Sequence, residues 1–431
     1  MALRYSILLL FLFIGLGSAT TTALSQESFS GRTFGGSVQY QVKLFAGDSP
    51  VDVELVKSKV ERRLNRINAL MSTYVSDSDV SRFNSSKSTE WIAVDAEVVR
   101  VVKRSLEISR QTEGAFDVTV GPLVRRWNFG PGKEEKFQLP SKVEIEELLQ
   151  RVGFENLEVR DEPPALRKNN LPDLEIDLSA IAKGYAVDAV AVALVEEGIA
   201  SFMVEVGGEV RVGGEKPDGS KWAVGINDPA TPLVNRSFAV TNLESQAMAT
   251  SGDYRNAHWI DGKRYSHSIN PKTGWPVEHN LASSSIVAAD CLSADAYATA
   301  AMVLGDKKSL ESAESWGVEI YNLSRNEESA KEAFSSTQTK GFPLKDFSAT
   351  KPSTNWTVAI AVFAFILAII GMSVGVIFSN RRIQGSCGGI ASLKEKQGED
   401  VACSMCSNPS DECKELREAM ERKQAAESQN S

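Results

Sequence analysis

The sequence predicts an α+β fold for the region between residues 28 and 345. Helical and strand-like patterns are mixed there without the regular alternation of a doubly wound sheet. The chain has 431 residues, of which 42% are hydrophobic and 24% charged, so it is long enough for one large globular domain or two to three ordinary ones. The net charge of −9 argues against nucleic acid as a partner.

Apolar spacing and end signals predict the individual elements. We expect helices over residues 51–71, 96–112, 141–152, 181–197 and 293–304, with Ser141 as an N-cap and Gly198 and Gly305 as stops. Strands are expected over residues 34–45, 174–178, 202–206, 210–212, 222–226, 238–241 and 284–288.

Two apolar runs predict how the chain meets the membrane. Residues 5–16 follow Arg4 and precede small residues, so residues 1–23 are predicted to be a signal peptide or a signal anchor. A linker over 346–355 leads to an uncharged run, and residues 356–379 are predicted to be a transmembrane helix. Arg381 and Arg382 follow this run. We therefore expect the protein in a bacterial inner membrane, with residues 380–431 in the cytoplasm and the large domain in the periplasm.

The five cysteines divide in the same way. Cys291 is the one cysteine of the large region, so no disulfide within that region is expected. The other four follow the predicted span: Cys387, Cys403, Cys406 and Cys413. In a reducing compartment such a group favours metal or redox roles over a disulfide framework.

A carboxylate, a helix start and a lysine come together in residues 177–188. Asp177 ends an apolar segment, and Lys183 stands six residues later at the start of a predicted helix. Helix N-termini bind anions and a lysine adds charge, so the stretch predicts a phosphate or nucleotide site. The alternative interpretation is an ordinary strand-to-helix junction with a surface lysine.

Two further patterns carry possible chemistry. Asp295 and Thr299 stand four residues apart on one helix face, and such oxygens suit Mg2+; a solvated aspartate beside a helix-bonded threonine is the alternative. His267, one of three histidines, precedes a turn and could deprotonate an attacking hydroxyl, or it could make a structural hydrogen bond.

Small residues and aromatic rings mark three other segments. Gly207-Gly208 lacks the spacing of a dinucleotide fingerprint and predicts a glycine-rich hairpin. Residues 71–74 and 114–119 each include a ring on which a planar ligand could stack, although core packing is the favoured interpretation of each segment viewed alone.

Taken together, these motifs resemble the ApbE family of FAD:protein FMN transferases. The matching segments come in family order and cover residues 34–305: 71–74 with 81–84, 114–117 with 121–127, 177–188, 206–209, 249–254, 267–274, and 294–296 with Thr299. The resemblance implies an α+β T-fold-like domain. It also implies a reaction that splits the FAD pyrophosphate, joins FMN to a threonine of a partner protein and releases AMP.

The resemblance also implies which residues form the site. The residues expected to contact FAD are Phe34, Tyr74, Ala115, Phe116, Asp117, Asp177, Lys183 and Ile269. A Mg2+ ion would bind the carbonyl of Ala180 and the side chains of Asp295 and Thr299. Some family members have an acidic residue where Ala298 stands, which implies one more water or weaker metal binding here. His267 is the candidate base, with Asp253 as an alternative.

The C-terminal segment resembles a second family. Arg381 to Ile390, then Cys403-x-x-Cys406 and Cys413, are similar to NqrM, the maturation protein of the Na+-translocating NADH:quinone oxidoreductase. That family is implicated in iron placement, and four thiolates suit iron; free thiols in a tail are the alternative. The same complex needs covalent FMN, so its subunits are the expected acceptors. A FAD pyrophosphatase and a non-enzymatic flavin-binding protein are the competing functions for the large domain.

Overall fold

The computed structural model describes residues 26–46, 51–130, 137–231, 236–254, 256–326 and 333–345, together with 365–366, 418 and 422. The chain divides into two compact units, residues 1–345 and 346–431. The predicted signal, most of the predicted span and the four C-terminal cysteines lie outside the described residues. Within the described ranges, no helix is both long and apolar enough to cross a membrane.

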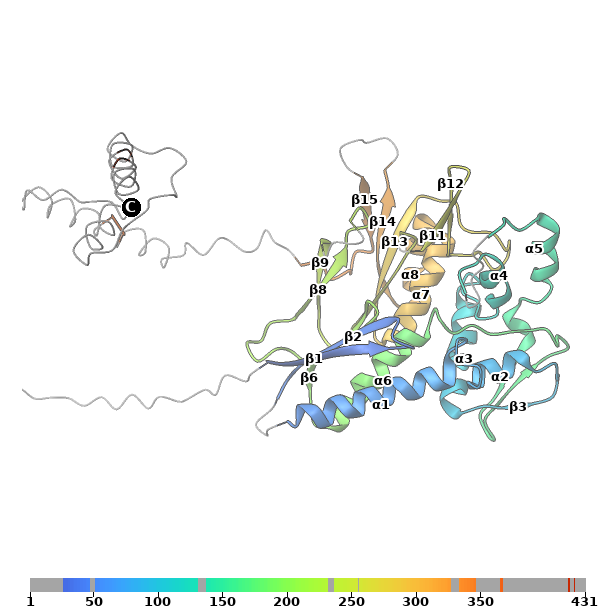
Figure 1. Cartoon of the computed structure of the whole chain (residues 1–431), viewed down its shortest axis with the longest axis horizontal. Coiled ribbons are helices and arrows are strands. Elements are labelled where there is room, and N and C mark those ends of the chain that lie inside the picture. Colours follow the sequence, from blue (N-terminus) through green and yellow to red (C-terminus); the bar gives the residue numbers. More distant parts are fainter. Residues whose placement is uncertain are drawn as a thin grey trace, which may run out of the picture. The chain divides into compact units, whose positions relative to one another are not determined.

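An eight-stranded antiparallel sheet forms the centre of the first unit (Figure 1). Its strand order is β1-β2-β6-β7-β10-β13-β14-β15. The strands are β1 (Gln26–Thr33), β2 (Val38–Phe45), β6 (Ser201–Val206), β7 (Glu209–Gly213), β10 (Ala247–Gly252), β13 (Leu281–Ala288), β14 (Glu319–Arg325) and β15 (Phe334–Gln338).

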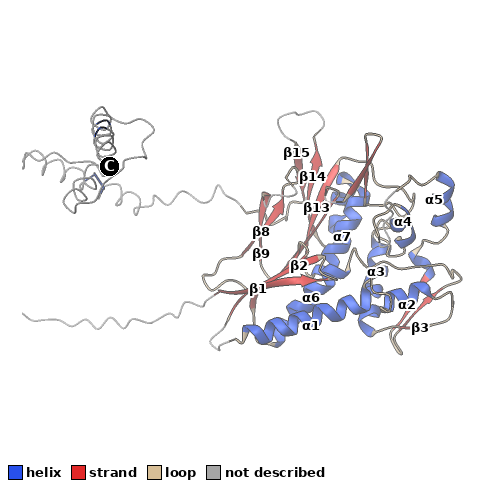
Figure 2. Ribbon diagram, viewed as in Figure 1, coloured by secondary structure: helices blue, strands red, loops and turns tan. Residues whose placement is uncertain are grey.

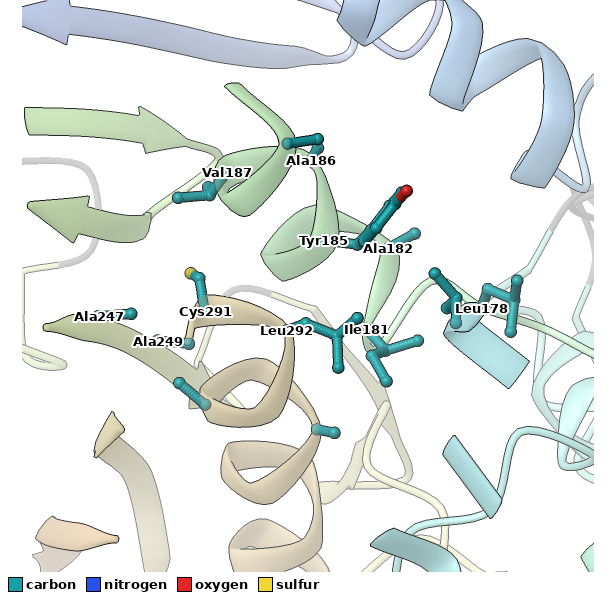
Figure 3. Packing of buried hydrophobic residues seen from close by; sticks show 14 of the residues in the cluster. Leu178, Ile181, Ala182, Tyr185, Ala186, Val187, Ala247, Ala249, Cys291 and Leu292 are labelled. Carbon is teal, nitrogen blue, oxygen red and sulfur yellow. The ribbon is translucent and has the colours of Figure 1, made fainter. Parts of the chain in front are cut away.

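Some of the helices cover one face of this sheet (Figure 2), namely α1 (Val53–Met71), α6 (Ala182–Glu196), α7 (Cys291–Leu304) and α8 (Asp306–Trp316). The other described helices are α2 (Asp79–Ser85), α3 (Ala96–Gln111), α4 (Gly121–Arg126) and α5 (Lys142–Leu149). Side chains alternate along a strand, so Ala247 and Ala249 of β10 enter the core beneath the helices. Figure 3 shows both alanines beside the first turn of α7, where their small size lets the helix approach.

The opposite face of the sheet carries a hairpin of β8 (Trp222–Asn227) and β9 (Ser237–Leu243). Met248 of β10 and Val287 of β13 point to this side and join a second apolar cluster with Trp222. The sheet is therefore buried on both faces, which explains why β13 is buried along its whole length.

Two smaller sheets complete the first unit. The strands β3 (Ile92–Ala93), β5 (Ala165–Lys168) and β4 (Leu157–Arg160) form one, and β11 (Ala257–Ile260) with β12 (Lys263–Ser266) forms the other; a short 3-10 helix spans Phe154–Asn156. A third apolar cluster joins Trp127, Phe129 and Ile269 to Ile145 of α5. The indole N–H of Trp127 donates to the carbonyl of Gly274 at 2.8 Å, which fixes the chain just after His267.

The structure confirms the α+β class and all five predicted helices to within a few residues. Ser141 caps α5 in a capping box, and Gly207-Gly208 forms the β6–β7 hairpin, both as predicted. Of the strand predictions, one is wrong in part and another is wrong altogether. Phe34 lies in the β1–β2 turn with φ +49°, so that strand begins at Val38. Residues 174–178 form no strand, because their backbone bonds go to single partners outside any ladder.

Candidate active site

The segment that leads into α6 is held by side chains instead of a sheet. Asn84 makes a two-way clamp with Ile176: its amide donates to the Ile176 carbonyl and its carbonyl accepts from the Ile176 N–H, both at 2.8 Å. The fully buried Lys168 donates to the carbonyls of Ser86 at 2.6 Å and Pro172 at 3.2 Å. The Asp177 N–H then donates to the Val118 carbonyl at 2.7 Å, which fixes the backbone of Asp177.

The start of α6 brings Lys183 to Asp295 of α7. The Lys183 ammonium lies 3.3 Å from each carboxylate oxygen of Asp295, which is only 2% exposed. The Gly184 N–H also donates to Asp295, at 3.0 Å. The two helices come this close because Gly184 has no side chain: a Cβ there would lie 2.3 Å from the Cys291 carbonyl oxygen. A residue pair 112 positions apart is thus joined by helix packing.

Glu209 completes a buried charge cluster around the lysine. Its Oε1 lies 2.9 Å from the Lys183 ammonium, and the residue is 4% exposed. The negative charges of Asp295 and Glu209 raise the pKa of Lys183 against the effect of burial, so the lysine stays protonated. Burial raises the pKa of Glu209, while Lys183 opposes that rise. The Oε2 of Glu209 is buried and has no hydrogen-bond partner among the described residues.

The oxygens predicted to hold a metal ion have the right chemistry. Asp295 supplies a buried carboxylate, and the Thr299 hydroxyl lies on the same helix face, 3.4 Å from the Ser251 hydroxyl. Because the Gly184 N–H turns to Asp295, it does not bond to the Ala180 carbonyl, and no described group donates to that carbonyl. Carboxylate, hydroxyl and carbonyl oxygens are the ligands that Mg2+ takes, so this set fits the predicted ion.

His267 follows directly after β12, with its ring held in one tautomer. Its Nδ1 lies 3.0 Å from the Asn256 carbonyl oxygen. A carbonyl only accepts, so Nδ1 carries the hydrogen and Nε2 of the neutral ring is left with its lone pair. Burial lowers the pKa of His267, and the charges of Lys183 and Arg264 lower it further, against Asn256 and Asp253. The ring is therefore neutral near pH 7 and suited to accept a proton.

Asp253, the alternative base, is fully engaged. The residue is 1% exposed and forms ion pairs with Arg264 and Arg325, the second at 2.5 Å and 2.8 Å. Two guanidinium groups occupy both of its oxygens, so neither oxygen is free to accept from a substrate hydroxyl. The geometry favours His267 over Asp253 as the base.

The residues predicted to contact FAD differ in their surroundings. Tyr74 has an exposed ring, and its pKa is raised by partial burial of the hydroxyl and by the nearby Asp177 carboxylate. Ala115 and Phe116 are buried in the main core, so their side chains pack there and present no free ring. Ile269 is buried in the third cluster. Phe34 lies at the tip of the β1–β2 turn, partly packed on the core.

Asp117 has a structural task in the loop before α4. One of its oxygens accepts from the N–H and hydroxyl of Thr119, both at 2.7 Å, and the other accepts from the Phe154 N–H at 3.1 Å. Burial raises the pKa of Asp117, and these bonds lower it. The carboxylate therefore joins the 117–119 turn to the chain at Phe154.

A cavity of about 520 Å3 lies elsewhere on α6, beside α1 and α3. None of the predicted site residues lines it. Its lining is Arg63, Arg100, Tyr185, Asp188, Ala189, Val192, Ala193, Glu196, Arg211, Asp290 and Leu292.

Comparisons with known proteins agree on the class. The sequence profile of the ApbE family matches residues 36–321, and that of (Na+)-NQR maturation NqrM matches residues 376–426. A FAD:protein FMN transferase of Haemophilus influenzae is 38% identical over 331 residues, 76% of this chain and 91% of that protein. One from Escherichia coli K12 is 37% identical, over 76% and 92%.

Solved structures agree as well. The flavin transferase ApbE of Vibrio cholerae superposes with a TM-score of 0.66 at 36% identity, over 74% of this chain and 98% of that one. The flavinyl transferase ApbE of Pseudomonas stutzeri gives 0.65 at 36% identity, over 74% and 95%. The fold is thus that of a flavin transferase. The chain belongs to the ApbE family, and its C-terminal segment matches the NqrM family.

Two residues with roles in this site were not predicted from sequence. Glu209 stands in a hairpin and in a family-matching segment, but no role follows for it from the sequence, although an acidic residue directly after Gly207-Gly208 is a usable signal. Asn84 belongs to a predicted motif, but its clamp on Ile176 joins residues 92 positions apart and has no local pattern.

Proposed function

We propose that the chain transfers FMN from FAD to a threonine hydroxyl of a partner protein, with Mg2+, and releases AMP. Its class, an FAD:protein FMN transferase, follows from its family and from relatives of 35–38% identity. The observation that carries the mechanism is that Lys183 contacts Asp295 of another helix, while the charge of Lys183 also acts on the tautomer-fixed His267. Each supplies one part of what phosphoryl transfer requires.

The charge on the pyrophosphate must be neutralised before a nucleophile can attack it. A Mg2+ ion held by the Ala180 carbonyl, Asp295 and Thr299 would supply Lewis-acid charge to the phosphate oxygens. Lys183 adds a fixed positive charge, and its raised pKa keeps it protonated at neutral pH. The N-terminus of α6, which has no side-chain cap, contributes the partial positive charge of the helix dipole.

The attacking threonine must lose its proton as the new bond forms. In this mechanism the proton moves from the threonine hydroxyl to Nε2 of His267. The threonine oxygen bonds to the FMN phosphorus, the bond from that phosphorus to the bridging oxygen breaks, and AMP leaves with that oxygen. The Asn256 carbonyl stabilises the imidazolium through Nδ1–H.

The C-terminal match supports a single client for both units. NqrM is described as a maturation factor of the (Na+)-NQR complex, so we propose that subunits of this complex, or a related one, accept FMN. Its four cysteines would then assist iron placement in the same complex. We also propose a signal segment, a span over 356–379, a periplasmic catalytic domain and a cytoplasmic tail in a bacterial inner membrane.

In-gel flavin fluorescence tests this proposal. The full-length chain in detergent is incubated with FAD, Mg2+ and the flavin-carrying subunit of a Na+-translocating NADH:quinone oxidoreductase. We expect a fluorescent acceptor band that survives denaturation and is lost when the acceptor threonine is replaced. AMP release without a band would support a FAD pyrophosphatase instead, and neither product would leave a flavin-binding protein.

A further inference from the structure

Lys183 has two carboxylate partners of different geometry. Glu209 Oε1 lies 2.9 Å from its ammonium, whereas both Asp295 oxygens lie at 3.3 Å. Glu209 is on β7 and Asp295 is on α7, so the two carboxylates reach the lysine from separate elements. All three groups are largely buried, and the cluster holds one positive and two negative charges.

Burying two carboxylates with one ammonium costs free energy unless a proton or a further cation balances the second negative charge, and burial does raise the pKa of Glu209. Glu209 Oε2, which has no hydrogen-bond partner among the described residues, is the carboxylate oxygen that the lysine does not satisfy. If Asp295 binds Mg2+, as the proposed function requires, its oxygens are no longer available to Lys183. The Lys183 ammonium must then be held by Glu209 alone, or it has no carboxylate partner in the cluster.

We propose that Glu209 is the positioning residue that holds the Lys183 ammonium when Asp295 is engaged by a divalent cation. This inference rests on the proposed metal site. Glu209 offers the shorter contact, and its free Oε2 can accept a second N–H as the lysine leaves Asp295. Without Glu209, Lys183 would remain on Asp295 and compete with the metal for the same oxygens.

The residues around Lys183 limit its side chain to positions near Glu209 and Asp295. At Gly207, φ is +68°, and a Cβ there would lie 3.4 Å from both Lys183 Cδ and Glu209 Oε2 and 2.9 Å from Val38 Cγ1. The hairpin backbone thus closes directly over the lysine stem. The ammonium can shift between the two carboxylates, but the stem cannot turn far away.

A double-mutant cycle read by Mg2+ affinity tests the inference. Mg2+ binding to the full-length chain in detergent, without FAD, is measured by calorimetry for the wild type, Glu209→Gln, Lys183→Met and the double variant. We expect Glu209→Gln to weaken Mg2+ binding about 10- to 100-fold, the usual cost of losing an outer-shell partner. In the Lys183→Met background, the same change should cost no more than about twofold, because no lysine then competes.

Equal losses in the two backgrounds would overturn the inference, since Glu209 would then act as a ligand or as a general charge. Unchanged Mg2+ affinity in Glu209→Gln would overturn it too. Glu205→Gln is the matched control, because Glu205 lies on the same hairpin and accepts from the Gly208 N–H at 2.8 Å; it should bind Mg2+ as the wild type does. Failure of the metal site itself is distinct: wild type and Asp295→Ala would then bind Mg2+ equally weakly.

Discussion

His267 differs from the other two histidines in what its ring contacts. His258 is sandwiched between Phe129 and Phe137 at 4.5 and 4.9 Å, and its Nε2 has no partner among the described residues. His279 packs against Gly305, and within the same described ranges both of its nitrogens are buried without partners. His267 has one nitrogen fixed by a carbonyl, which is the arrangement of a proton acceptor.

Replacing His267 tests its role directly. We expect His267→Ala to lower kcat/KM on the order of 10²-fold or more, since general-base catalysis contributes about that much. The wild type needs the neutral ring, and burial lowers the pKa of His267 below 6.5. Its rate should therefore stay constant down to pH 6.5 and fall only as the pH drops through the lowered pKa. The variant should lose this acid limb, and an unchanged rate across pH would remove His267 from the role.

Asp295 supports both the proposed metal and the packing of α6. Asp295→Ala should abolish turnover, because it removes a charged metal ligand and the acceptor of the Gly184 N–H. Asp295→Asn keeps an acceptor oxygen for that N–H, so it should fold like the wild type and still lose most activity. The measurement is rate against Mg2+ concentration. A wild-type rate at limiting Mg2+ in either variant would show that the metal assignment is wrong.

At the scale of the elements, the site depends on the close crossing of α6 and α7. Gly184→Ala would place a Cβ 2.3 Å from the Cys291 carbonyl oxygen and 2.9 Å from Asp295 Cβ. We expect a loss of about 1–3 kcal/mol in the free energy of unfolding, typical of overpacking, together with weaker Mg2+ binding as the helices separate. Denaturant unfolding measures the first.

Gly121→Ala is the matched control for that change. It also adds a methyl group to a buried helical glycine, but the nearest atom would lie 3.5 Å away, in ordinary contact. Its unfolding free energy should stay close to that of the wild type. If Gly184→Ala were equally harmless, the close approach of the two helices would not be what positions Asp295.

The sequence predicted the elements with strong local signals and missed those without them. Helix α3 was predictable because its apolar residues repeat at helical spacing. Strand β15 is short and polar, and strand β10 is built from small residues, so neither has the alternation of a typical strand. The same limit applies to the site: Lys183 stands in a recognisable motif, whereas the role of Glu209 exists only where β7 meets α6. Asp253 is a plausible base from the sequence alone, but in the fold it forms ion pairs with Arg264 and Arg325.

At the scale of the whole molecule, two family matches occupy separate parts of one chain. The ApbE match lies within residues 36–321 and the NqrM match within 376–426, on either side of the boundary between the two compact units. All residues of the proposed flavin mechanism belong to the first unit. The chemistry of FMN transfer should therefore not depend on the C-terminal cysteines.

We expect a full-length variant with Cys387, Cys403, Cys406 and Cys413 changed to serine to transfer FMN to the purified acceptor at the wild-type rate. In cells that lack other maturation factors, the same variant should give an oxidoreductase that carries FMN but contains less iron, because serine does not replace the thiolate ligands of iron. His267→Ala should give the opposite result, with normal iron and no covalent FMN. If either variant lost both the covalent FMN and the iron, the two units would depend on each other for function. The separate family matches would then not correspond to separate activities.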